Sequence, residues 1–252
     1  MAVLVLLPPS EGKASGGRRA PLDLDALSFP TLAGVRARLV DAVQDLARRD
    51  PAGLRAALGC SAEQAALDAH LTTSPTLPAL ARYTGVVYDA LSPATLSPGA
   101  KRRANGTLVV CSSLFGLLRP RDPVPAYRLS GQTVLPGVGG LAALWRPEVE
   151  PLLAQEPLVV DLRSGAYAGL ARAPHAVVVR VLRDDDGRRT TVSHDNKWTK
   201  GLLARALCEN GARRPRDVAE LGRTVSDDVE VDGRRVDLVL HGLARARAVQ
   251  PV

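Results

Sequence analysis

Short runs dominated by Val and Leu constrain the fold more than any other feature of this 252-residue chain. The runs that lie within strand length are Ala2 to Leu7, Thr107 to Ser112, Leu158 to Leu162 and Ala176 to Leu182. Apolar runs of this kind are typical of strands covered on both faces of a sheet. Because helical patterns separate them, the sequence predicts a mixed α/β (α+β) fold with a mixed sheet flanked by helices. No linker divides the chain, so residues 1–252 are predicted to form a single domain.

The segments between these runs supply the other predicted elements. Helical spacing or capping signals mark Leu32 to Arg49, Leu77 to Leu91, Leu141 to Leu153, Thr199 to Cys208 and two short helices within Pro51 to His70. Shorter strand candidates are Val124 to Leu129 and Thr133 to Leu135, and Asp186-Gly187 predicts a tight hairpin between Ala176 to Leu182 and Arg189 to Ser193.

The ratio of arginine to lysine is unusual: 29 of the 33 basic residues are Arg and only four are Lys. With 26 acidic residues the formal net charge is +7 and the pI is about 9.8, which permits contact with phosphate or nucleic acid but also fits a solvated arginine surface. Three scattered Cys and four dispersed His exclude a disulfide framework and predict no metal site. No apolar run approaches membrane-spanning length and no signal peptide is recognisable, so we expect a cytoplasmic protein without a membrane partner.

Three polar segments carry candidate binding residues. The first is the loop PPSEGKASGG at 8–17, in which glycines permit close backbone approach to a ligand and Ser10, Glu11 and Lys13 supply polar groups. Its spacing is not that of a phosphate-binding P-loop, and an ordinary flexible loop fits equally well.

The second segment is Ser112 to Leu129, which follows a predicted buried strand where open sheets usually hold ligands. Arg119, Tyr127 and Arg128 stand out here, because a guanidinium matches the geometry of a carboxylate or phosphate. For Arg119 a structural pair with Asp122 is the somewhat better interpretation, whereas Tyr127 and Arg128 favour a ligand.

The third segment is Ser193 to Gly201 (SHDNKWTKG), which passes from a strand into a helix. The start of a helix favours an anion, and Lys197 and Lys200 lie three residues apart on one face. Half of all lysines in the chain lie here, although surface lysines at a helix start remain the alternative. A histidine–aspartate pair at 194–195 does not indicate a catalytic triad, because adjacent residues rarely face each other.

Together these residues resemble the YaaA peroxide-stress proteins of bacteria. The similarity runs over nearly the whole chain, and its most specific parts are S-L-F-G-L-L-R-P-R-D at 113–122 and P-A-Y-R-L at 125–129. Further matching stretches are Y-T-G-V-V-Y-D-A-L at 83–91, V-V-D-L-R-S-G-A-Y at 159–167 and K-W-T-K-G-L-L-A-R at 197–205. Many members have P-A-K-T after the first strand, where this chain has P-S-E-G-K, so Lys13 is displaced relative to the family pattern.

The resemblance implies a cytosolic protein that limits iron-dependent oxidative DNA damage when peroxide rises. It also implies DNA binding through a helix-hairpin-helix-like element, for which Leu54 to Leu67 is the candidate. Arg55, Gly59 and Ser61 are its expected DNA-binding residues, with Ser61 in place of a second glycine. A hairpin of this type contacts the phosphate backbone and does not read the base sequence.

A second hypothesis is an enzyme that acts on a phosphorylated or nucleotide-like small molecule in a cleft lined by Lys, Arg and Tyr. Ser10, Lys13, Arg119, Tyr127, Arg128 and Lys200 are the expected phosphate-binding residues. Lys197, if desolvated against Trp198, would be the nucleophile or general base and Glu11 the general acid. Neither hypothesis requires a cofactor, and the second requires the three segments to meet.

Overall fold

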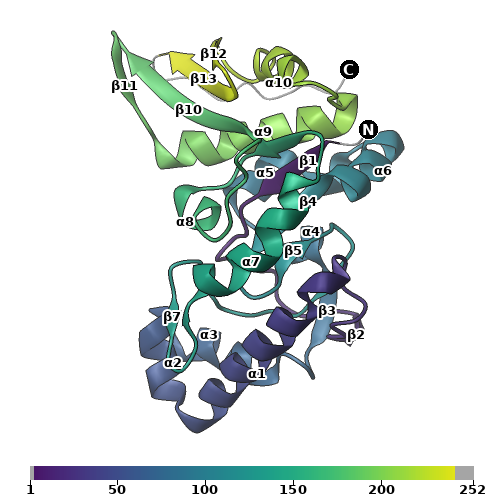
Figure 1. Cartoon of the computed structure of the whole chain (residues 1–252), viewed down its shortest axis with the longest axis vertical. Coiled ribbons are helices and arrows are strands. Elements are labelled where there is room, and N and C mark those ends of the chain that lie inside the picture. Colours follow the sequence, from purple (N-terminus) through teal and green to yellow (C-terminus); the bar gives the residue numbers. More distant parts are fainter. Residues whose placement is uncertain (1–2, 242–252) are drawn as a thin grey trace.

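The computed structural model describes residues 3–241, which fold around one mixed β-sheet (Figure 1). Its strands are β1 (Leu4–Leu7), β4 (Leu108–Ser112), β5 (Gly116–Leu118), β9 (Val159–Asp161), β10 (Val177–Asp185), β11 (Arg188–Thr190), β12 (Asp228–Asp232) and β13 (Arg235–His241). The sheet order is β12-β13-β10-β9-β1-β4-β5, with β11 paired to β10. The mixed α/β fold class predicted from the sequence is confirmed.

The centre of this sheet is parallel, from β13 through β10, β9 and β1 to β4. All four residues of β1 are buried, and Val5 pairs with Leu108 of β4 on one side and with Val160 of β9 on the other. Each of the four Val- and Leu-rich runs coincides with one of these strands, and β10 continues three residues beyond its run to Asp185. The strand order reverses at β1, because the chain builds β4 on one side of it and β9 on the other.

Antiparallel strands close both edges of the sheet. β5 pairs with β4, β12 pairs with β13, and β11 pairs with β10. The turn between β10 and β11 has Asp186 and Gly187 at positive φ (52° and 87°), which is the tight hairpin that the sequence predicts. β12 and β13 have no counterpart among the sequence-based predictions.

Two helices on one side of the sheet form the walls that matter below: α5 (Val86–Leu91) and α9 (Ser193–Asn210). They pack closely because Gly201 of α9 has no side chain, and a Cβ there would lie 2.4 Å from the Val87 carbonyl oxygen. Helix α9 begins at Ser193, six residues before the predicted start at Thr199, so Lys197 and Lys200 both lie within the helix.

The remaining helices flank the sheet and extend the molecule at both ends (Figure 1). They are α1 (Ala33–Arg49), α2 (Pro51–Leu58), α3 (Ala62–Ala66), α4 (Ala79–Arg82), α6 (Pro98–Thr107), α7 (Leu141–Ala154), α8 (Gly165–Ala168), α10 (Pro215–Gly222) and the 3-10 turns η1 (Pro30–Leu32), η2 (Leu67–His70) and η3 (Pro93–Thr95). Two small sheets consist of β2 (Arg19–Pro21), β3 (Pro75–Pro78) and β6 (Pro123–Val124), and of β7 (Val134–Leu135) and β8 (Gly139–Gly140). None of the helices within residues 3–241 is long and apolar enough to cross a membrane.

Two further predicted elements have other boundaries in the structure than the sequence predicts. The helix expected over Leu77 to Leu91 is divided into β3, α4 and α5, because Gly85 adopts a φ of 100° that interrupts a helix. Of the strand expected over Val124 to Leu129, only Val124 belongs to β6, since Pro125 has no N–H and the Arg128 N–H donates to the Asp68 carboxylate.

The loop after β1 is held in place rather than free. The Ala14 N–H donates to the Arg82 carbonyl oxygen at 2.8 Å, and the Arg82 guanidinium donates to the carbonyl oxygens of Ala14 and Gly16. Arg82 has no exposed surface. The backbone of residues 14–16 is therefore hydrogen-bonded to a buried arginine, which favours an ordered loop over an ordinary flexible one.

Candidate functional site

A cavity of about 600 Å³ lies where the parallel strands β1 and β9 end. Its floor comes from Pro8 to Gly12, which follow β1, and from Leu162 and Ser164, which follow β9. In open α/β sheets ligands bind at the carboxyl ends of strands where the strand order reverses, and β1 is that point here. The cavity has the size of a small-molecule site.

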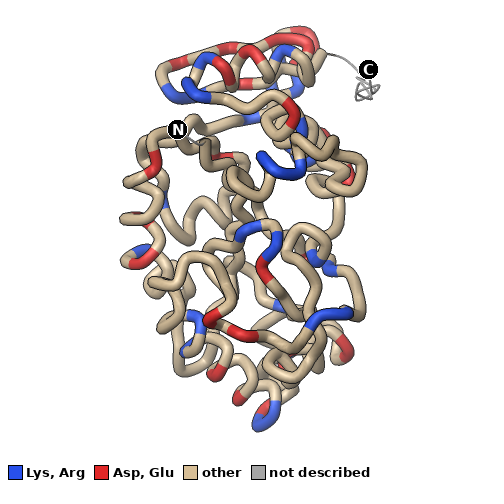
Figure 2. The backbone as a smooth tube through the Cα atoms, turned by 90° about the vertical axis from the view of Figure 1, so that its right-hand side faces the viewer, with Lys and Arg blue, Asp and Glu red and all other residues tan. Residues whose placement is uncertain are grey.

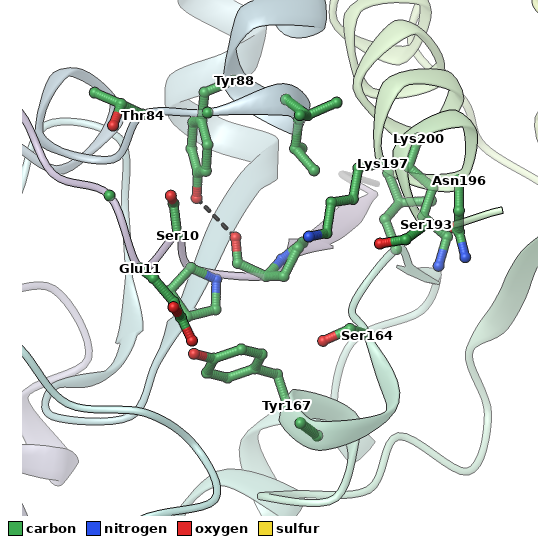
Figure 3. Close-up of a pocket in the computed structure, with 18 of the residues that line it drawn as sticks. Ser10, Glu11, Thr84, Tyr88, Ser164, Tyr167, Ser193, Asn196, Lys197 and Lys200 are labelled. Atoms are coloured by element: carbon green, nitrogen blue, oxygen red, sulfur yellow. Dashed lines mark hydrogen bonds between the residues drawn. The ribbon is translucent and has the colours of Figure 1, made fainter. Parts of the chain in front are cut away.

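Helix α9 forms one wall of the cavity and carries its two lysines, Lys197 and Lys200 (Figure 3). Lys197 is exposed, whereas Lys200 is only 7% exposed and its Nζ donates to the Arg163 carbonyl oxygen at 3.2 Å. Burial lowers the pKa of Lys200 to about 8, against the opposing attraction of Asp161. Lys200 is thus an amine that changes charge slightly above neutral pH.

This arrangement corrects the expected role of Lys197. Of the two lysines on α9, Lys200 is the desolvated one, and the Trp198 ring stacks on the His194 ring with 6.3 Å between the ring centres. Residues three apart lie on the same face of a helix. Lys200 is nevertheless buried, whereas Lys197, almost one turn earlier in α9, is exposed.

The opposite wall combines hydroxyl groups with one ion pair. Ser10 and Glu11 lie across the cavity from the lysines, as do Thr84 and Tyr88 of the segment that begins α5 (Figure 3). The Tyr88 hydroxyl donates to the Pro8 carbonyl oxygen at 2.8 Å. At the rim, Arg128 Nη2 lies 2.9 Å from Glu11 Oε2 and forms an ion pair with it. Glu11 is therefore an anchored carboxylate rather than a free general acid.

A buried polar cluster lies behind this wall. Lys13 Nζ donates to the Ser10 carbonyl oxygen at 3.0 Å and sits 4.1 Å from the centre of the Tyr127 ring. Burial and the nearby charge of Arg128 lower the pKa of Lys13 to about 7. Burial also raises the pKa of Asp68 to about 7, although its Oδ1 accepts the Arg128 N–H at 2.8 Å. The cluster supports the Ser10–Glu11 loop from below.

Tyr127 belongs to this cluster and does not line the cavity. It is 1% exposed, and its hydroxyl group is hydrogen-bonded to the hydroxyls of Tyr83 at 2.8 Å and Ser112 at 2.7 Å. Burial raises its pKa well above 10. Tyr127 is thus a packed, neutral phenol with both of its hydrogen-bond functions in use.

The three predicted segments meet only in part. The structure brings Ser10, Glu11, Lys197 and Lys200 to one cavity, and Arg128 joins them through Glu11. Arg119 lies elsewhere: its Nη1 donates to the Gly106 carbonyl oxygen at 2.8 Å and its guanidinium lies 5.1 Å from the Phe29 ring centre. The predicted Arg119–Asp122 contact exists, but it is the Arg119 backbone N–H that donates to the carboxylate, at 2.9 Å.

Sequence reasoning did not single out several cavity residues. Ser164, Tyr167 and Asn196 line the cavity, and Asp68 belongs to the cluster behind it. Ser164 and Tyr167 follow a predicted buried strand within V-V-D-L-R-S-G-A-Y, so the position after β9 was a usable signal. The sequence around Asp68 contains no such signal, because its hydrogen-bond partner, Arg128, is 60 residues away in the chain.

The expected DNA-binding residues do not line the cavity: Arg55 lies in the last turn of α2, and Gly59 and Ser61 lie in the turn between α2 and α3. Gly59 adopts a left-handed conformation (φ 58°), and Ser61 caps α3 through a capping box with Gln64. The Gly59 N–H donates to the Arg55 carbonyl oxygen at 2.9 Å and the Ser61 N–H to Gln64 Oε1 at 3.3 Å. Gly59, Ser61 and the Arg55 side chain are all exposed. The two predicted short helices and the Ser61 cap are thus present.

Within residues 3–241 no group of three or more His, Cys, Asp or Glu side chains is arranged to hold a metal ion. The polar lining of the cavity instead includes two lysines, several hydroxyls and the Asn196 amide, all of which can donate, and one carboxylate, Glu11, which is paired with Arg128. Such a set suits the oxygen atoms of an anion rather than a cation.

A family model described as "Peroxide stress protein YaaA" matches residues 3–226. The chain belongs to the YaaA family. A UPF0246 protein of Corynebacterium efficiens is 43% identical over 250 residues, covering 94% of this chain and 99% of its own length. A UPF0246 protein of Streptomyces coelicolor is 42% identical over 243 residues, covering 91% and 93%. Membership of this family supports a role in the response to peroxide stress.

Proposed function

We propose that this YaaA-family protein binds duplex DNA in the cytoplasm through the phosphate backbone and thereby limits iron-dependent oxidative damage. Family membership supports the stress role, and the exposed turn between α2 and α3 carries the DNA-binding part of the proposal. This turn combines a left-handed glycine, exposed polar backbone and an exposed arginine, Arg55.

The turn offers two kinds of contact to a phosphate. Within the described chain the Arg55 guanidinium has no hydrogen bond or ion pair, so its donors are available. The Ser61 N–H is held by the neutral amide oxygen of Gln64 at 3.3 Å. A phosphate oxygen would replace that amide oxygen with a charged acceptor, and charge-assisted hydrogen bonds are stronger.

The wider charge distribution favours contact without base recognition. The net charge is +7, yet Lys and Arg alternate with Asp and Glu along the tube in Figure 2 and form no continuous stripe in that view. Dispersed cations attract a polyanion weakly and over a broad surface. Affinity for DNA should therefore depend strongly on salt and little on sequence.

Fluorescence anisotropy with a labelled duplex, measured over a series of salt concentrations, tests this proposal. The logarithm of the binding constant should fall linearly with the logarithm of salt, by about 0.9 for each phosphate neutralised. Arg55→Ala should make this slope shallower by about 0.9, the contribution of one phosphate contact. The matched control is Arg223→Ala, which removes an exposed arginine next to α10, at the opposite end of the molecule from α2 (Figure 1). Binding that is equal at low and high salt would contradict the proposal.

The protective part needs a separate measurement. Supercoiled plasmid exposed to ferrous iron and hydrogen peroxide should be nicked more slowly with the wild-type protein than with Arg55→Ala. If both proteins protect equally, protection does not operate through the α2–α3 turn. The second hypothesis, an enzyme for a phosphorylated small molecule, concerns the cavity instead.

A further inference from the structure

The cavity holds more positive than negative charge. Glu11 is the one carboxylate among its lining residues in the described chain, and it is already paired with Arg128. Neither Lys197 nor Lys200 forms an ion pair with any carboxylate of residues 3–241. Two ammonium groups at the cavity wall are therefore left without a counter-ion, which favours an anionic ligand.

Lys200 shows the same imbalance at the level of single hydrogen bonds. An ammonium group has three N–H donors, and the Arg163 carbonyl oxygen accepts one of them at 3.2 Å. Asp161, whose charge acts on Lys200, accepts two hydrogen bonds of 2.9 and 2.8 Å from the Arg163 guanidinium. A side chain that is 93% buried and lines a cavity thus retains donors for a partner that enters from solvent.

The rest of the cavity fits the remainder of such a ligand. Pro9, Val86 and Leu162 are apolar, and Tyr167 contributes an aromatic ring to the lower wall (Figure 3). Ser10, Thr84, Ser164 and Ser193 add hydroxyl groups around this apolar surface. A volume of about 600 Å³ accommodates a mononucleotide-sized molecule.

We propose that the cavity binds the terminal phosphomonoester of a nucleotide, with the phosphate between Lys197 and Lys200 of α9 and the nucleoside towards Tyr167 and Val86. A phosphomonoester carries a charge of about −1.5 to −2 at neutral pH, which balances two lysines, whereas a carboxylate balances only one. This site is separate from the α2–α3 turn, and neither proposal depends on the other. The same phosphate could belong to a free mononucleotide or to the phosphorylated end of a DNA strand.

Isothermal titration of the full-length protein with adenosine 5′-monophosphate is the direct test, with adenosine as the ligand that lacks the phosphate. We expect binding of the monophosphate, at least about tenfold weaker binding of adenosine, and displacement by inorganic phosphate. Lys197→Met should weaken the binding of adenosine 5′-monophosphate by at least about tenfold. Lys197 is exposed, so this variant is expected to fold.

The matched control is Lys101→Met, because Lys101 is an exposed lysine on α6 whose Nζ donates to the Ala94 carbonyl oxygen. It should bind the monophosphate like the wild type. Equal weakening in Lys197→Met and Lys101→Met, or no binding by the wild type at millimolar monophosphate, would overturn the proposal.

Two single-stranded oligonucleotides, one with a 5′-phosphate and one with a 5′-hydroxyl, separate the two sources. If the strand end is the ligand, the phosphorylated form competes with the monophosphate and the hydroxyl form does not. If neither competes, the ligand is the free nucleotide. If both compete equally, the site does not select a phosphomonoester, and the proposal is overturned. Arg55→Ala should keep the monophosphate affinity while it loses affinity for duplex DNA, so the two proposals fail independently.

Discussion

Three buried cations in this protein have nearly the same exposure and very different surroundings. Arg36 and Arg82 have no exposed surface, and Lys200 is 7% exposed. Each arginine donates four hydrogen bonds to backbone carbonyl oxygens, whereas Lys200 donates one. The acceptors are Phe115, Phe29, Ser28 and Leu117 for Arg36, and Val124, Ala14, Gly16 and Pro75 for Arg82.

The difference separates structural cations from cations available to a ligand. A guanidinium with four of its five N–H donors bonded to carbonyl oxygens ties distant segments together and has one donor left for any ligand. An ammonium that lines a cavity with donors to spare stabilises little and can bind an anion. Burial alone therefore does not distinguish these cations, whereas the number of occupied donors does.

The largest expected effect tests the structural side of this comparison. Arg36→Met should lower the free energy of unfolding by about 3 to 5 kcal/mol, because it leaves several buried carbonyl groups without donors. Urea denaturation measures it. Arg38→Met, an exposed arginine on the same helix, is the control and should change stability by less than about 0.5 kcal/mol. A loss below about 1 kcal/mol for Arg36→Met would show that occupied hydrogen-bond donors do not mark a structurally important cation.

The next effect concerns Lys200 and pH. Burial lowers its pKa from 10.5 to about 8 in the folded protein. Between these pH values the unfolded chain keeps a proton that the folded protein has released, so the free energy of unfolding rises with pH. The full rise from this one group is about 3 kcal/mol.

Comparison of wild type with Lys200→Met isolates this contribution, because all other titrating groups are shared. The wild type should gain stability relative to the variant between a pH below 8 and a pH near 10.5. Nucleotide affinity should fall over the same range, since the neutral amine no longer attracts a phosphate. Parallel stability profiles would mean that Lys200 is not desolvated.

A smaller effect is expected for Tyr127, which the sequence assigned to a ligand. Tyr127→Phe removes two buried hydrogen bonds and should lower the free energy of unfolding by about 1 to 2 kcal/mol. Its affinity for adenosine 5′-monophosphate should not change. Tyr167→Phe, at the cavity wall, is the comparison and should affect stability less. Loss of nucleotide binding in Tyr127→Phe with unchanged stability would move Tyr127 back among the binding residues.

The smallest effect tests the α2–α3 turn. Glu63 is an exposed carboxylate in the first turn of α3, close to Arg55, and it repels an approaching phosphate. Glu63→Gln should raise the affinity for duplex DNA by about twofold at low salt and by less at high salt. Glu220→Gln, an exposed glutamate of α10, controls for the change in net charge. Equal gains in both variants would place the DNA elsewhere.

Local sequence patterns predicted the elements whose cause is local. The Val- and Leu-rich runs became β1, β4, β9 and β10, and the Ser61 cap and Asp186-Gly187 turn formed as expected. The expectation that Lys197 and Lys200 lie on one face of a helix also agrees with the structure, since both line one cavity.

The errors came from interactions between distant segments. Tyr127 is occupied by Tyr83 and Ser112, and Asp68 meets Arg128 across 60 residues, so no pattern in either neighbourhood reveals them. Lys200 is buried while Lys197 is exposed, and Gly201, which follows Lys200, lies directly against α5. The packing of α9 against α5 is a contact between distant segments that the local sequence pattern did not reveal.

Gly201 follows Lys200 directly, and its backbone lies against α5. A methyl group at this position would lie 2.4 Å from the Val87 carbonyl oxygen and 2.6 Å from the Ala90 side chain. The two helices that contribute walls to the cavity therefore touch at Gly201, where only a hydrogen atom fits between them. A side chain at this position, which does not itself line the cavity, would push α5 and α9 apart and change the shape of the cavity.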